Sequence, residues 1–144
     1  MEILQKKNIK INCPPMEKMA VVRRMGEMLQ EAGYVTPAYI QAMVDKEGTM
    51  DTYLGNGIAI PHGIESARDE VITSGLGVMV FPKGIDWNGK KVRVVLGIAG
   101  KGDEHVEILS NIAVTLSDPK AVDQLVASDA AGIYTMLGEP EAQE

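Results

Sequence analysis

The chain has 144 residues, of which 45% are hydrophobic and 24% are charged, and its formal net charge at pH 7 is -6. This composition is typical of a soluble globular protein, and the length predicts a single domain over residues 1–144. The acidic balance and the lack of a basic cluster argue against binding to nucleic acid or to an anionic membrane surface. Cys13 is the only cysteine, which excludes an internal disulfide and fits a cytoplasmic protein, and no apolar run is long enough for membrane insertion.

The first third of the sequence predicts a strand followed by two helices. Polar and apolar residues alternate over residues 8–12, as in a strand with one buried face. Apolar residues then recur every three or four positions over residues 16–32, which predicts an amphipathic helix. Thr36 is the expected N-cap of a second helix that ends near residue 48. Lys46 would lie in its last turn, where a positive charge complements the helix dipole.

The most informative stretch is residues 53–63, which reads Tyr-Leu-Gly-Asn-Gly-Ile-Ala-Ile-Pro-His-Gly. The β-forming residues 58–60 predict a short strand, and Pro61 ends it because proline has no N–H for the strand ladder. His62 therefore emerges just past a strand end. Gly63 adds no side chain, so we expect open backbone beside the imidazole, where a reacting group can approach.

The next segment predicts two strands that pair with each other. Residues 65–71 have weak helical periodicity and predict a short helix. Residues 76–81 and 92–99 are rich in β-forming side chains. Turn signals at residues 82–84 and 88–89 lie between them, so we expect an adjacent antiparallel pair.

A glycine-rich turn, residues 100–105, follows the second of these strands. Asp103 is a suitable N-cap, and the apolar spacing after it predicts a helix with His105 in the first turn. Such a position, past a strand end and at a helix N-terminus, favours anions because backbone N–H groups and the helix dipole point there. Asp118 and Ser128 are the expected N-caps of two further short helices.

Both histidines of the chain, His62 and His105, fall in turns that follow strands, which favours a functional role. A metal site with Asp103 or Glu104 as added ligands is one alternative, although the chain has no third histidine or suitably spaced cysteines. A serine or cysteine hydrolase is disfavoured, because the sequence has no Gly-x-Ser-x-Gly motif and no obvious base near Cys13. The glycines before His62 lack the rest of either nucleotide-binding motif.

Three stretches together resemble the mannitol/fructose-type IIA family of the bacterial phosphoenolpyruvate-dependent sugar phosphotransferase system, most closely its mannitol branch. They are residues 33–43, residues 53–63 with Ile-Pro-His-Gly at their end, and residues 97–105. The likeness covers nearly the whole chain in order. It implies an α/β fold with a single mixed five-stranded β-sheet flanked by helices on both sides.

The resemblance also implies a phosphocarrier. His62 would be the phosphohistidine nucleophile, which takes a phosphoryl group from the phosphocarrier protein HPr and passes it to a cysteine of the cognate IIB component. The expected outcome is uptake of a sugar alcohol, with mannitol the best fit, through a IIB/IIC permease on separate chains. If His62 reacts through Nε2, as in the family, an acceptor must hold its Nδ1 proton, and we expect a backbone carbonyl. No metal or other cofactor is required.

Two further residues would assist. His105 resembles the second active-site histidine of the family and would donate a hydrogen bond to the transferring group. Lys46 stands where the mannitol-type pattern commonly has arginine, and lysine offers a point charge for phosphate attraction in place of a bidentate fork. Apolar surface around His62, including Ile60 and Ile64, is the expected docking surface for HPr and IIB.

A regulatory protein of the same fold is the second hypothesis. In the nitrogen-regulatory branch of the family, phosphorylation of the residue that corresponds to His62 would control binding to a target instead of feeding sugar uptake. The closer mannitol-type signature favours the transport role.

Overall fold

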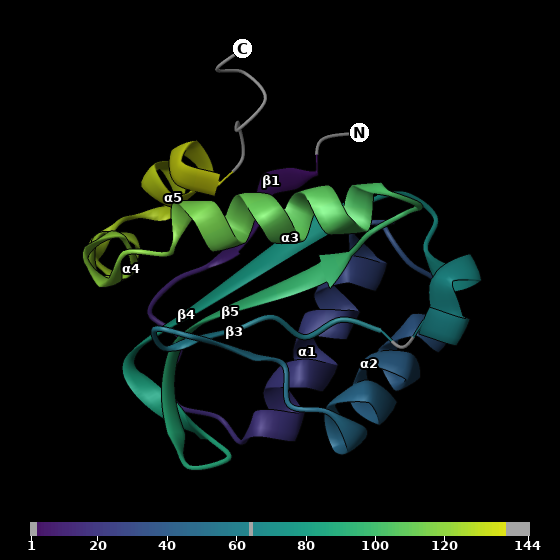
Figure 1. The fold of residues 1–144 in the computed structure, drawn as a ribbon, viewed down its shortest axis with the longest axis horizontal. Helices are drawn as coiled ribbons and strands as arrows, with labels where there is room; N and C mark the ends of the chain where they lie inside the picture. The colour runs from purple at the N-terminus through teal and green to yellow at the C-terminus, as the bar shows by residue number, and fades with distance from the viewer. Residues whose placement is uncertain (1–2, 64, 138–144) are drawn as a thin grey trace.

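The structure is a computed structural model that describes residues 3–63 and 65–137 of the chain (Figure 1). Its strands are β1 (Leu4–Lys10), β2 (Tyr53–Gly55), β3 (Ile58–Ala59), β4 (Gly75–Trp87) and β5 (Lys90–Ala99). Its helices are α1 (Lys18–Glu31), α2 (Ala38–Thr49), the 3-10 helix η1 (Glu65–Glu70), α3 (Glu104–Thr115), α4 (Pro119–Ala127) and α5 (Ala130–Leu137). No helix in the described ranges is both long enough and apolar enough to cross a membrane.

Within these described ranges the strands form one mixed five-stranded sheet in the order β1-β4-β5-β3-β2. The long central strands β4 and β5 are antiparallel. β1 runs parallel to β4, β3 runs parallel to β5, and β2 is antiparallel to β3. Helices α1 and α2 cover one face, and α3, α4 and α5 cover the other (Figure 1). The predicted fold class, a mixed sheet with helices on both sides, is confirmed.

The two central strands supply the core of both layers, because successive side chains of a strand point to opposite faces. Leu76, Val78 and Val80 of β4 pack with the helices α3 to α5. Met79 and Phe81, which alternate with them, pack on the other face with α1 and α2. Strands that are buried on both faces read as nearly continuous apolar runs, which is why the sequence signal for them was strong.

Glycines let α1 and its following turn lie unusually close to the sheet. A Cβ atom added at Gly97 would lie 2.0 Å from Cγ of Met25, and one at Gly75 would lie 2.1 Å from the Tyr34 ring. Glycine inside a strand ordinarily weakens it. Here the missing side chains make room for large residues of the α1 layer, so the glycines serve the packing between helix and sheet.

Three predictions of turns and helix caps are wrong. Residues 82–84 form no simple turn, because β4 continues to Trp87 with a shift in its pairing to β5 between Val80 and Ile85. Irregular pairing tolerates the missing N–H of proline. Thr36 is not the cap of α2, since its hydroxyl instead donates to the Glu70 carboxylate.

The third wrong prediction concerns the start of α5. Asp129, and not Ser128, caps this end, because its carboxylate accepts the N–H of Gly132 at 2.8 Å. The Ser128 hydroxyl donates back to the carbonyl of Gln124. Asp118 does cap α4 as expected, accepting the N–H of Lys120 at 2.9 Å.

The close approach of α1 to the sheet gives a stability prediction. We expect Gly97→Ala to lower the free energy of unfolding by about 1–3 kcal/mol, because the added methyl must displace Met25 in a packed core. Urea unfolding followed by circular dichroism measures the change. Gly48→Ala is the matched control: nothing lies within 4 Å of its added Cβ in α2, so stability should rise by about 0.5–1 kcal/mol. Wild-type stability of Gly97→Ala would contradict the packing argument.

Candidate active site

His62 lies just past the end of β3, as the sequence predicts. The backbone around it stays attached to β5: the N–H of Ile98 donates to the carbonyl of Pro61 at 3.0 Å, and His62 forms an isolated parallel bridge with Ile98. The imidazole itself is half-buried. A fixed backbone with a partly exposed ring is the arrangement that a reactive side chain needs.

The imidazole of His62 is held in one tautomer. Its Nδ1 lies 2.7 Å from the carbonyl oxygen of Ile60. Because a carbonyl oxygen can only accept a hydrogen bond, Nδ1 must carry the proton. In the neutral ring Nε2 then keeps its lone pair. The backbone acceptor expected from the sequence is therefore the carbonyl two residues before the histidine.

His105 lies beside His62 and belongs to a different element, the helix α3. It is the second residue of α3, in the first turn of the helix, and its ring centroid lies 5.2 Å from that of His62, with 57° between the planes. The helix start sits very close to the end of β5. A Cβ atom at Gly100 would lie only 2.4 Å from Cα of His105, so the turn needs glycine there.

Ser74 forms hydrogen bonds that stabilise the turn directly before His105. Its buried hydroxyl accepts the N–H of Lys101 at 2.9 Å and donates to the Glu104 carboxylate at 2.5 Å. A hydrogen bond to a carboxylate is stronger than one between neutral groups. The residue directly before His105 is thereby tied to the segment before β4.

The third predicted residue, Lys46, lies in the last turn of α2 and is half-buried. Its neighbour Glu47 is buried, and its carboxylate accepts the N–H of Thr52 at 3.0 Å and the hydroxyl of Thr52 at 2.6 Å. Both charges act on His62. The site thus combines an imidazole pair with one cation and one hydrogen-bonded anion from α2.

Burial is the main cause that lowers the pKa of His62 below its ordinary value of 6.5. The hydrogen bond to Ile60 opposes this by favouring the protonated ring. Electrostatic interaction with Lys46 and His105 lowers the pKa of His62 further, and the carboxylate of Glu47 opposes this shift. The net effect keeps the imidazole neutral at pH 7, so its Nε2 is available as a nucleophile.

The backbone beside His62 is not open, contrary to the prediction. A Cβ atom at Gly63 would lie 2.5 Å from Cε1 of Tyr39, so the aromatic ring of α2 fills the space next to the glycine. Gly63 is needed for this packing, because a side chain at position 63 would clash with the Tyr39 ring. Ile60 is half-buried and packs against the core on the α3 side. Ile64 lies outside the described residues.

Sequence reasoning missed Tyr39, Glu47 and Ser74 as parts of the site. One signal was available for Glu47, because an acidic residue in the last turn of a helix opposes the helix dipole and calls for an explanation. Tyr39 matched the apolar stripe of its helix, and Ser74 lay between two predicted elements. Nothing in their local pattern indicates what their hydroxyl groups bind.

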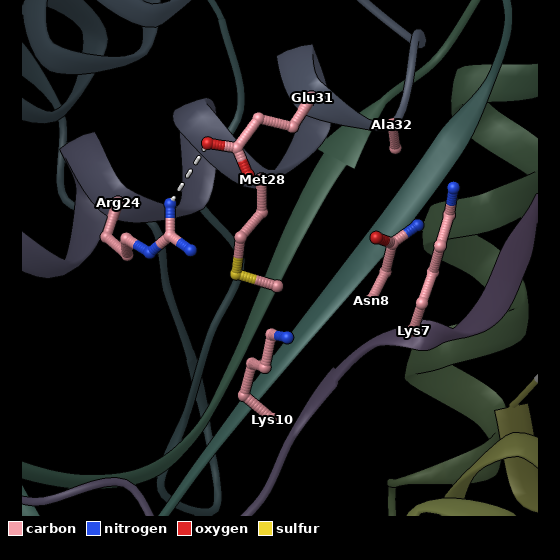
Figure 2. Close-up of a pocket in the computed structure, with 7 residues that line it drawn as sticks. All are labelled: Lys7, Asn8, Lys10, Arg24, Met28, Glu31 and Ala32. Carbon is pink, nitrogen blue, oxygen red and sulfur yellow. Dashed lines mark ion pairs between the residues drawn. The ribbon is translucent and has the colours of Figure 1, made fainter.

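A cavity of about 180 Å³ lies between β1 and α1, apart from both histidines (Figure 2). Arg24 on its wall pairs with Glu31 across 3.6 Å. The lining residues are Lys7, Asn8, Lys10, Arg24, Met28, Glu31 and Ala32, and they include none of the predicted site residues. In the part of the chain that the structure describes, no three His, Cys, Asp or Glu side chains are grouped so as to hold a metal ion.

Comparison with known proteins identifies the family. The family model described as "Phosphoenolpyruvate-dependent sugar phosphotransferase system, EIIA 2" matches residues 2–139. The mannitol-specific phosphotransferase enzyme IIA component of Halalkalibacterium halodurans is 45% identical over 138 residues, which is 95% of each chain. That of Bacillus subtilis is 42% identical over 129 residues, covering 89% of this chain and 90% of its own.

A solved structure agrees. The crystal structure of IIA mannitol from Escherichia coli superposes with a TM-score of 0.85 at 31% identity, covering 92% of this chain and 97% of its own. The same fold, a sequence match over most of both chains and a family model that spans nearly all residues lead to one conclusion. The chain belongs to the EIIA type 2 family of the phosphoenolpyruvate-dependent sugar phosphotransferase system.

Proposed function

We propose that the chain is a phosphocarrier that takes a phosphoryl group from phosphorylated HPr onto His62 and passes it to a cysteine of a cognate IIB component. The observation that carries the proposal is the geometry of the two imidazoles: His62 is held with Nε2 unprotonated, 5.2 Å from the ring of His105. The mannitol-specific names of relatives at 45% and 42% identity support mannitol as the sugar alcohol.

Phosphoryl transfer needs little from the protein beyond in-line positioning and stabilisation of charge. In the first step, the Nε2 lone pair of His62 attacks the phosphorus. A P–Nε2 bond forms as the bond to the donor breaks, and the donor leaving atom takes that electron pair. The ring now carries the phosphoryl group on Nε2 and a proton on Nδ1, and its positive charge is stabilised by the Ile60 carbonyl at 2.7 Å.

In the second step, a cysteine thiolate of IIB attacks the same phosphorus. The P–Nε2 bond breaks, its electron pair returns to Nε2, and neutral His62 is restored with its proton still on Nδ1. A structure of the Escherichia coli mannitol IIA enzyme in complex with phosphorylated IIB, at 30% identity and a TM-score of 0.85, supports IIB as the partner.

His105 and Lys46 supply the charge stabilisation in this proposal. His105 sits at the N-terminus of α3, where the helix dipole favours the incoming anion. Its ring can donate a hydrogen bond to a phosphoryl oxygen as charge develops. Lys46 provides a positive charge from the opposite layer, without the bidentate geometry of arginine.

The nucleophile should be identified by mass. We expect intact-mass analysis after incubation with phosphoenolpyruvate, enzyme I and HPr to show one acid-labile phosphoryl group on the wild type and none on His62→Ala. His105→Ala should still be labelled, at a rate about 100-fold lower, because it removes one stabilising donor. Labelling of His62→Ala would exclude His62 as the acceptor. An unlabelled, folded wild type would exclude this donor.

The charges around His62 predict its titration. We expect its imidazole to titrate below pH 6.5 in NMR spectra, and Lys46→Met to raise that pKa because a nearby positive charge is removed. Lys83→Met, at an exposed position of β4, is the control and should leave the pKa unchanged. The pKa of this histidine is higher in the unfolded chain than in the fold, so the unfolded chain binds the proton at a higher pH. The free energy of unfolding should therefore decrease as the pH falls from 6.5 through the native pKa. Titration at or above pH 6.5 would contradict the account.

An exposed apolar side chain next to His105 predicts where partners dock. Val106 follows His105 and is 64% exposed. We expect Val106→Asp to raise the KM for IIB about tenfold with little change in kcat, because a charge disfavours an apolar contact. Val114→Asp is the matched control, because Val114 lies on the same helix and is 76% exposed. It lies about 12 Å further along the helix axis from His105 than Val106 does. Equal effects of the two substitutions would argue against a docking surface at the histidines.

A further inference from the structure

Two segments far apart in the sequence must be held together for the proposed transfer. His62 follows β3, and His105 follows β5, so the distance between the rings depends on how the turn at residues 61–63 is attached to the end of β5. The bond from Ile98 to the Pro61 carbonyl fixes one side of that turn. Tyr39 of α2 fixes the other.

We propose that Tyr39 is a positioning residue for phosphoryl transfer, whose hydroxyl ties the backbone that carries His62 to the strand end that leads to His105. The inference rests on the proposed function of His62. Tyr39 itself does not contact the reacting atoms in this account. It acts through the two backbone groups that it binds.

The hydroxyl of Tyr39 is used both as donor and as acceptor. It accepts the N–H of Gly63 at 2.8 Å and donates to the carbonyl of Ile98 at 3.0 Å. One oxygen atom therefore bridges the residue after His62 and the residue of β5 that pairs with His62. Misplacement of reacting groups by about 1 Å can cost two orders of magnitude in rate, so such a bridge bears directly on transfer.

The aromatic ring adds a steric constraint to the bridge. It occupies the space in which a Gly63 side chain would lie, with Cε1 2.5 Å from the position of an added Cβ. The turn is thus packed against the ring and hydrogen-bonded to its hydroxyl at the same time. Tyr39 is only 3% exposed, so a partner protein cannot reach it from outside.

The hydroxyl remains a donor over the physiological pH range. Burial raises the pKa of Tyr39 above its ordinary value of 10.0, although the hydrogen bond from Gly63 opposes the shift. The protonated form is the one that can bond to the Ile98 carbonyl, which only accepts. The Tyr39 hydroxyl therefore keeps its proton, and both hydrogen bonds, in the pH range in which His62 is proposed to transfer the phosphoryl group.

The test compares Tyr39→Phe, which keeps the ring and removes the hydroxyl, with Tyr53→Phe. Tyr53 is a matched control because its hydroxyl accepts the N–H of Gly57 at 3.1 Å, the same kind of bond to a glycine turn. That turn lies near the far end of α3, where Asn56 bonds to the carbonyl of Leu116. Transfer rates are measured over a range of phosphorylated HPr concentrations, and the His62 tautomer is read from long-range ¹H–¹⁵N spectra.

We expect Tyr39→Phe to lower kcat about tenfold and to leave KM for phosphorylated HPr unchanged, because Tyr39 is buried away from the donor. The fraction of His62 protonated at Nδ1 should fall, because the turn that aims the ring at Ile60 is loosened. Tyr53→Phe should change neither. Wild-type kcat and tautomer in Tyr39→Phe, or equal losses in both variants, would overturn the positioning role.

Two features of the design keep the outcomes separate. The tautomer measurement needs no phosphoryl donor, so it tests positioning even if the wild type is not phosphorylated and the proposed function fails. If Tyr39→Phe does not fold, hydrogen exchange of the Gly63 amide in the wild type decides the matter. Slow exchange would support the bridge, and exchange as fast as in an unstructured peptide would refute it.

Discussion

The hydrogen bond from Nδ1 of His62 to the carbonyl of Ile60 is the interaction on which the site depends. It determines which ring nitrogen is protonated, and so which one keeps the lone pair that the proposed transfer needs. The acceptor belongs to the main chain two residues upstream, so no side chain has to be placed for it. The orientation of the His62 ring thus follows from the path of the backbone, and that path is fixed by pairing with β5.

The electrostatics of the site balance two needs. A nucleophilic imidazole must be neutral, and burial with the nearby charge of Lys46 favours the neutral ring. In the proposed transfer the incoming phosphoryl group is an anion, and the same lysine would attract it. Glu47 acts in the opposite sense on both, and its hydrogen bonds to Thr52 keep this buried carboxylate satisfied. Charges of both signs from one turn of α2 therefore tune a residue on another element.

The sequence predicted correctly those features that depend on a few neighbouring residues. Pro61 ends a strand because it lacks an N–H, so the position of His62 could be read from the sequence. The turn predicted at residues 82–84 is absent, because long-range pairing of β4 with β5 overrides a local turn signal. Local patterns therefore do not predict features that depend on such pairing. The hydroxyl of Tyr39 binds backbone groups of residues 63 and 98, which are distant in sequence. The hydroxyl of Ser74 likewise binds groups of residues 101 and 104. Their roles depend on the completed fold.

The parallel pairing of β3 with β5 has a consequence for how the chain folds. Ile58 pairs with Val94, so this contact closes a long loop that includes all of β4 and the first part of β5. Contacts of large sequence separation form late, because the chain entropy of loop closure opposes them until other contacts compensate. A partly folded chain with only its local helices and hairpin would have a solvated histidine with both tautomers accessible. The single tautomer of His62, on which the proposed transfer depends, is therefore acquired together with the native topology.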